Sequence, residues 1–211
     1  MPEVQTLLAF LVASALITAA PGPDNLMVLS QSLSRGRSAG LGLAVGCALG
    51  CLTHTLWATL GVSALVASSP ALFTTLKLAG AAYLLWLGVG ALSSRGPRRI
   101  DGAAPRPPEP WTRYLRRGFV ANAINPKVAL FFLAFMPQFV DPGAGGASLQ
   151  MAVLGAVFVV QTIVIFGLFA LAAARLGALL SRRPGVGRWL DRFTGLVFVG
   201  LAARLALDSS H

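Results

Sequence analysis

Two long stretches of this 211-residue chain, residues 38–76 and residues 142–174, contain no Asp, Glu, Lys or Arg. A helix of about 20 mostly apolar residues crosses the hydrocarbon core of a bilayer, which is about 30 Å thick. Strands in soluble folds are far shorter, at about 3–10 residues. Charged residues make up 11% of the chain, against about 25% in soluble domains. The sequence therefore predicts an all-α integral membrane protein.

The chain is strongly basic, with 17 Lys and Arg against 7 Asp and Glu and a net charge of +10. Such a balance alone would suit a protein that binds nucleic acid. Here, however, most of the charges lie in three short segments between apolar runs. Basic residues between spans stay in the cytoplasm during insertion, so the distribution indicates membrane topology. We expect membrane lipid around the spans and no nucleic-acid partner.

Six membrane spans are expected. They cover residues 4–33, 39–67 and 71–93 in a first half (1–93), and residues 116–140, 148–174 and 191–208 in a second half (115–211). The segment between the halves, residues 94–114, is rich in Pro, Gly and Arg, which is typical of a solvated linker.

Basic residues occur only in alternate loops between these spans. The loops after spans 1, 3 and 5 contain arginines, whereas the loops after spans 2 and 4 contain no Lys or Arg. The positive-inside rule then places the basic loops in the cytoplasm and both termini outside. An inverted repeat of two three-helix halves fits this topology, because the second half would enter the membrane from the opposite side.

Proline interrupts spans 1 and 4. Pro21, Gly22 and Pro23 break the first span, and Pro126 breaks the fourth. Counted from the cytoplasmic ends, both breaks lie roughly 14–17 Å deep, near the bilayer midplane. A broken helix at that depth persists only where protein or a water-filled cavity surrounds it. We therefore expect the two breaks to share one cavity.

A charged residue follows each break directly. Asp24 follows Pro23 and Lys127 follows Pro126. A charge at this depth is costly and usually marks a functional site. We expect Asp24 to bind the ammonium of a zwitterionic amino acid, and Lys127 with a helix N-terminus to bind its carboxylate. Asn25, Asn122 and Asn125 would add neutral hydrogen bonds; the alternative is a permanent Asp24–Lys127 ion pair that braces two kinked helices.

Cys47, Cys51 and His54 fall on one face of span 2. Thiolates and imidazole bind transition metals, so a metal exporter is one alternative function, and a membrane thiol-redox protein is another. Because buried cysteine usually behaves as a small apolar residue, we predict no metal site. His54 is a second candidate proton carrier beside Asp24.

Glycines lie at close spacing in two spans. Two sets are typical of closely packed membrane helices: Gly40, Gly42, Gly46 and Gly50 in span 2, and Gly80, Gly88 and Gly90 in span 3. We expect both sets to lie at helix contacts.

Several short motifs occur in order along nearly the whole chain: Pro21–Asn25, Ser34–Gly40, Gly46, Lys77–Gly88, Asn125–Lys127, Phe131–Phe132 and Pro137–Phe139. Together these motifs resemble those of one known family, the LysE/RhtB amino-acid exporters. The resemblance implies a bacterial inner-membrane transporter, not an enzyme, that exports threonine, homoserine, its lactone or leucine by proton antiport. It implies no cofactor, and the sequence leaves open whether the protein forms a homodimer.

Overall fold

A computed structural model describes the chain except residues 1–2, 63–69, 95–108, 142, 183 and 208–211. Within the described residues the regular secondary structure is entirely helical. The all-α fold class is therefore confirmed. The main helices are α1 (Val4–Ala19), α2 (Pro23–Arg35), α3 (Arg37–Trp57), α5 (Pro70–Leu92), α6 (Trp111–Ala123), α7 (Pro126–Leu130), α8 (Ala147–Arg182) and α9 (Pro184–Leu207). A π-helical turn (Ala58–Val62) extends α3, and a π-helical turn (Phe131–Phe135) followed by a 3₁₀ turn (Met136–Phe139) extends α7.

The described helices include three that are long and apolar enough to cross a membrane: Arg37–Gly61, Thr74–Leu92 and Ala147–Leu179. Two bent pairs meet the same criterion as broken spans, α1 with α2 at 58° and α6 with α7 and its extension at 51°. Both helices break where the prolines predict. The protein is a multi-pass membrane protein. α9 carries charges at Arg188, Asp191 and Arg192, so its composition does not by itself establish a sixth span.

Three helix boundaries differ from the expected ones. The fourth span begins at Trp111, not at 116, which shortens the linker. The fifth continues to Arg182 and the sixth begins at Pro184. These additional turns contain arginine beside apolar residues, and a hydropathy average misses such amphipathic ends. Most of the linker and the end of span 2 lie outside the described residues.

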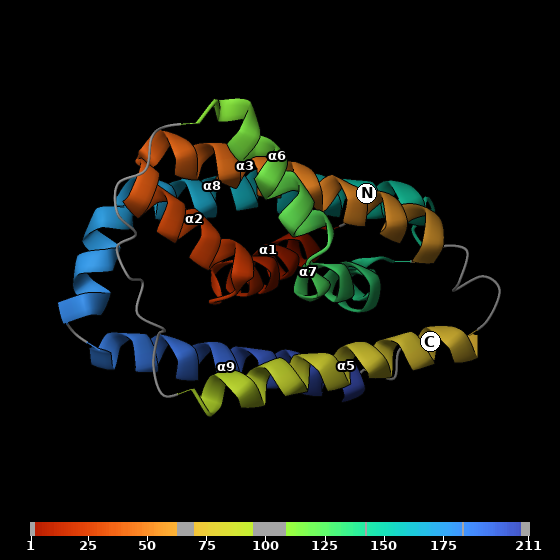
Figure 1. Ribbon diagram of the computed structural model, residues 1–211. Helices are drawn as coiled ribbons and strands as arrows, with labels where there is room; N and C mark the ends of the chain where they lie inside the picture. Colours follow the sequence, from red (N-terminus) through yellow and green to blue (C-terminus); the bar gives the residue numbers. More distant parts are fainter. Residues whose placement is uncertain (1–2, 63–69, 95–108, 142, 183, 208–211) are drawn as a thin grey trace.

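The helices form two layers (Figure 1). α5 and α9 pack along each other and form the lower layer in this view, while α3 packs along α6 and α8 in the other. The division into two inverted halves stays a prediction. Toward the left of the figure lie the ends of α2 and α8 and the starts of α3, α6 and α9. We call this the basic end; it contains Arg35, Arg37, Arg113, Arg117, Arg182 and Arg188.

Glycine lets α3 and α6 approach very closely. A Cβ atom on Gly46 would lie 2.1 Å from the Leu115 carbonyl oxygen, and one on Gly118 would lie 2.3 Å from the Leu43 carbonyl oxygen. A side chain at either position would collide with backbone, which cannot turn aside. The glycines of span 2 therefore lie at a helix contact, as expected, and they fix α6 beside α3.

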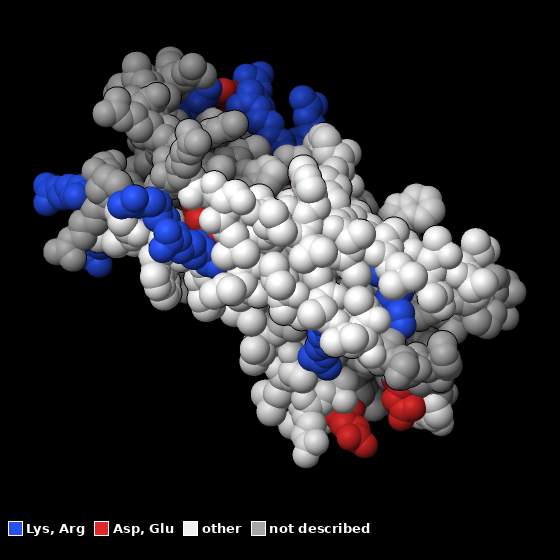
Figure 2. All heavy atoms as spheres, turned by 90° about the horizontal axis from the view of Figure 1, so that it is seen from below, with Lys and Arg blue, Asp and Glu red and all other residues white. Residues whose placement is uncertain are grey.

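The exterior matches a membrane protein. In the view of Figure 2, blue Lys and Arg atoms gather mainly at one end, and a broad area between the ends is almost free of charge. Large apolar side chains such as Leu56, Trp57 and Leu196 are exposed on the surface of the protein. Exposed apolar side chains on this scale are stable in contact with lipid.

Candidate functional site

The two helix breaks bring Asp24 and Lys127 to one internal cavity. Pro23 begins α2 and Pro126 begins α7, where the missing proline N–H costs no hydrogen bond. The charged residue after each proline is thereby placed in the first helical turn. The cavity is lined by Ile17, Thr18, Asp24, Asn122, Lys127, Val128, Phe131, Phe158, Thr162 and Phe166.

Asp24 is 2% exposed, and its two carboxylate oxygens differ. Oδ2 accepts a hydrogen bond of 2.8 Å from Asn122 Nδ2, whereas Oδ1 has no hydrogen-bond partner. A buried carboxylate oxygen without a partner is costly. The N-terminus of α2 offsets part of that cost, because its partial positive charge attracts an anion.

Lys127 is 6% exposed and reaches back to the broken first span. Its Nζ donates hydrogen bonds of 3.1 Å each to the carbonyl oxygens of Ile17 and Ala20 at the end of α1. The break frees these carbonyls from helical bonding, and an ammonium suits the negative end of a helix dipole. Asp24 and Lys127 form no ion pair, so the bracing alternative is not what the structure contains.

Three further predicted residues hold the breaks rather than line the cavity. Asn25 Nδ2 donates to the carbonyl oxygen of Thr18 at 2.8 Å. Asn125 Oδ1 accepts from the backbone N–H of Lys127 at 3.0 Å and caps α7. His54 Nε2 lies 2.9 Å from the Asn122 carbonyl oxygen. Because a carbonyl only accepts, that nitrogen carries the proton, and the imidazole satisfies the end of α6.

The rest of the cavity wall is mostly apolar. Its apolar lining consists of Phe131, Phe158 and Phe166, which we call the aromatic wall, with Ile17 and Val128. The cavity has a volume of about 10 Å³, which is about the space of a single water molecule. An amino acid is much larger, so this conformation is closed to substrate.

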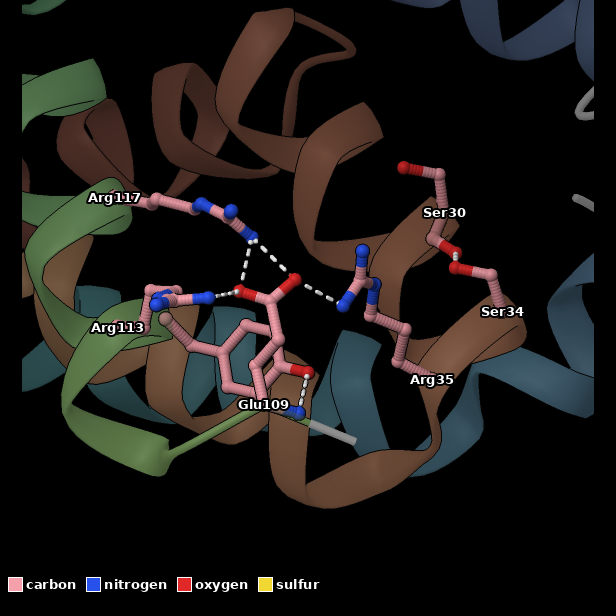
Figure 3. Close-up of polar contacts among 7 residues, drawn as sticks. Ser30, Ser34, Arg35, Glu109, Arg113 and Arg117 are labelled. Atoms are coloured by element: carbon pink, nitrogen blue, oxygen red, sulfur yellow. Dashed lines mark hydrogen bonds and ion pairs between the residues drawn. The ribbon is translucent and has the colours of Figure 1, made fainter. Parts of the chain in front are cut away.

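A network of ion pairs connects α2 with α6 at the basic end (Figure 3). Glu109, just before α6, pairs with Arg35 at the end of α2 and with Arg113 and Arg117 on α6. Its backbone N–H donates to the Tyr114 hydroxyl at 2.9 Å. Loss of hydration raises the pKa of Glu109, but hydrogen bonds from Arg117 and Arg113 and the charges of Arg117 and Arg35 outweigh this effect. The pKa therefore lies below its ordinary value of 4.5.

The cysteines offer no metal site. Cys47 and Cys51 are free and buried, and Cys51 Sγ lies 3.4 Å from Asn122 Oδ1. In the part of the chain that the structure describes, no three His, Cys, Asp or Glu side chains lie close enough together to hold a metal ion. The metal-exporter alternative therefore has no ligand set among these residues.

Sequence reasoning missed part of this site. It named Asn122 but not its bond to Asp24, and it missed the aromatic wall and Glu109. Phe131 follows Lys127 by four residues, which is one helical turn, and this spacing could have pointed to the cavity. Phe158 and Phe166 give no such signal, because α8 is apolar on all sides.

One known protein family matches nearly the whole chain, including every residue that lines the cavity. A family model described as LysE type translocator matches residues 15–209. The chain belongs to the LysE type translocator family. This confirms the resemblance drawn from the motifs.

Three relatives illustrate the similarity within this family. An uncharacterized membrane protein of Vibrio cholerae is 34% identical over 97% of this chain and 98% of its own. Leucine efflux proteins of Klebsiella pneumoniae and of an Enterobacter species are each 31% identical, over 94% and 93% of this chain and 93% of their own length. No solved structure matches the chain significantly.

Proposed function

We propose that this protein exports neutral, apolar amino acids of the leucine type from the bacterial cytoplasm by proton antiport. Family membership and relatives that are named leucine efflux proteins support export of an amino acid. The basic end, on the positive-inside rule, faces the cytoplasm, and both termini face outward across the inner membrane.

One observation carries the proposal: the carboxylate of Asp24 is buried with Oδ1 unpartnered, at a cavity that also contains the ammonium of Lys127. The Asp24 carboxylate lies at the N-terminus of α2, whereas the Lys127 ammonium lies at the C-terminal end of α1, and the two groups form no ion pair. A zwitterion satisfies both. Its ammonium donates to Asp24 Oδ1, and its carboxylate accepts from Lys127 and from the first free N–H groups of α2.

The aromatic wall supports an apolar side chain on the substrate. A carbon chain lying against Phe131, Phe158 and Phe166 gains from leaving water, whereas a second ammonium would find no anion there. This favours leucine-like substrates over lysine. Threonine and homoserine would leave their hydroxyl near Thr18 and Thr162, which also line the cavity.

Transport requires the closed cavity to open alternately toward each side. α3 of the first half packs along α6 of the second half, and α8 of the second half packs along α1 and α2 of the first, which is the pattern that an inverted repeat would give. Opening toward the cytoplasm separates Arg35 from Glu109, and opening outward moves α5 and α9 away from the aromatic wall.

Proton coupling centres on Asp24. Its carboxylate binds either a proton or the substrate ammonium, so a proton entering from outside displaces the substrate, and its departure to the cytoplasm restores the site. His54 is the weaker candidate because Nε2 already donates to the Asn122 carbonyl.

Export can be tested in cells that lack their own leucine exporters. Cells with and without the protein are fed leucine-containing and lysine-containing dipeptides, and amino acids are measured inside and outside. We expect faster leucine release and unchanged lysine release, and collapse of the proton gradient should abolish the difference. Equal release of every amino acid with and without the protein would overturn the proposal.

A further inference from the structure

A second, larger hollow is an open groove along α5 and α9, beside the break of the first span. Its volume is about 480 Å³, and it runs from Asp191 and Ser94, near the basic end, to Pro21 at the break of the first span. α5 and α9 supply most of its lining, with Trp86 and Phe198 as its aromatic members. We call it the α5–α9 groove. Unlike the closed cavity, it has room for an amino acid.

Asp191 is the anionic group of this groove. Its Oδ2 accepts a hydrogen bond of 2.6 Å from the Ser94 hydroxyl. Among the described residues no Lys or Arg lies within ion-pair distance of it, although the basic end is rich in arginine. Glu109, at the same end, is held by three arginines. Asp191 therefore has no cationic partner among these residues, and a ligand cation can pair with it.

The far end of the groove lies one residue from the charged site. Pro21 lines the groove, and a Cβ atom on the next residue, Gly22, would lie 2.9 Å from Lys127 Nζ. The backbone of the break is thus the partition between groove and cavity. Lys127 fixes the end of α1 beside this backbone, because its Nζ donates hydrogen bonds to the Ile17 and Ala20 carbonyl oxygens.

Gly90 lies on the open, exposed side of the groove. The sequence pattern predicts a helix contact at this residue, and Gly88 indeed meets α9 at Val199 and Gly195. Gly90 instead lines the groove, and a Cβ atom built on it would meet nothing within 4 Å.

We infer that the α5–α9 groove is a second substrate site on the cytoplasmic side, where Asp191 binds the ammonium of the amino acid before it passes the helix break. The inference rests on the proposed function. The apolar and aromatic lining accommodates the substrate side chain, and opening of the break at Gly22 passes the molecule to Asp24 and Lys127.

Leucine uptake into inside-out vesicles tests the ammonium contact. These vesicles expose the basic end, so the concentration dependence of uptake reports the groove. We expect Asp191→Asn to raise the half-saturation concentration about tenfold, because an ionic hydrogen bond becomes a neutral one. The maximal rate should change little, since Asn retains the acceptor for Ser94. Asp141→Asn, an exposed aspartate in the loop before α8, is the matched control.

The outcomes separate the two proposals. If the wild type takes up no amino acid, the proposed function fails. If the wild type transports and Asp191→Asn keeps its half-saturation concentration, or loses only maximal rate, the groove site is overturned.

A second pair of variants tests the groove without touching a charge. Gly90→Phe should fill the groove and block uptake, whereas Gly200→Phe on α9, where a Cβ atom also meets nothing within 4 Å, should not.

A labelling experiment tests whether water and substrate reach the groove. Ala91→Cys should react with a charged, membrane-impermeant thiol reagent in inside-out vesicles, and leucine should slow the reaction. The native cysteines are buried. Unimpaired uptake by Gly90→Phe, or no labelling of Ala91→Cys because lipid fills the groove, would overturn the inference.

Discussion

Replacing Asp24 by asparagine removes one negative charge from the cavity and almost preserves the shape of the side chain. The Asn oxygen can still accept the 2.8 Å bond from Asn122, and the new amide takes the position of the unpartnered Oδ1. We therefore expect the variant to reach the membrane at normal abundance. What it loses is the ionic hydrogen bond to the substrate ammonium, which contributes about 1.5–3 kcal/mol.

That loss can be expressed as a transport rate. About 1.4 kcal/mol corresponds to a factor of ten, so the efficiency of leucine export should fall by about ten- to one-hundred-fold. The assay is the initial efflux of labelled leucine from preloaded cells, divided by the amount of protein in the membrane. Asp141→Asn should export normally. Wild-type efflux by Asp24→Asn at equal abundance would refute the assignment of Asp24 as the ammonium-binding group.

Three further predictions follow from other contacts. Gly46→Leu should prevent α3 from packing on α6 and leave little folded protein in detergent, whereas Gly200→Leu should yield normal amounts. Phe158→Leu should enlarge the cavity and raise export of phenylalanine relative to leucine by about tenfold, measured by competition; an unchanged ratio would exclude Phe158 from the substrate site. Glu109→Gln should lower the melting temperature at neutral pH. Because the pKa of Glu109 is depressed, the advantage of the wild type should persist down to its ordinary value of 4.5 and disappear only as the pH falls through the lower folded-state pKa.

The helix breaks could be predicted from sequence because proline acts locally. Pro23 and Pro126 lack the N–H that would continue the preceding helix, whatever surrounds them. A charge directly after each break was equally visible. The roles of Asp24 and Lys127 could not be predicted, because they depend on partners far away in the sequence. Lys127, for example, contacts carbonyl oxygens 107 and 110 residues earlier in the chain.

Residues on uniformly apolar helices were the hardest to assign. Gly88 and Gly90 have the same chemistry and lie two residues apart, yet one meets α9 and the other faces the groove. Only the orientation of α5 decides between them. The early start of α6 was missed for a related reason, since its first turns contain arginines that contact Glu109 outside the apolar span.

A single residue, Gly36, with φ of 88°, joins α2 to α3. A one-residue connection lets the two helices move very little relative to each other, and a side chain at this positive φ would strain the backbone. Tilting α2 must therefore either swing the helix about this one pivot or carry α3 with it, together with α6, which is fixed to α3 at Gly46 and Gly118. Lengthening the joint by a few flexible residues should let Asp24 move independently of that block, and the protein would then leak its cargo instead of exchanging it for protons.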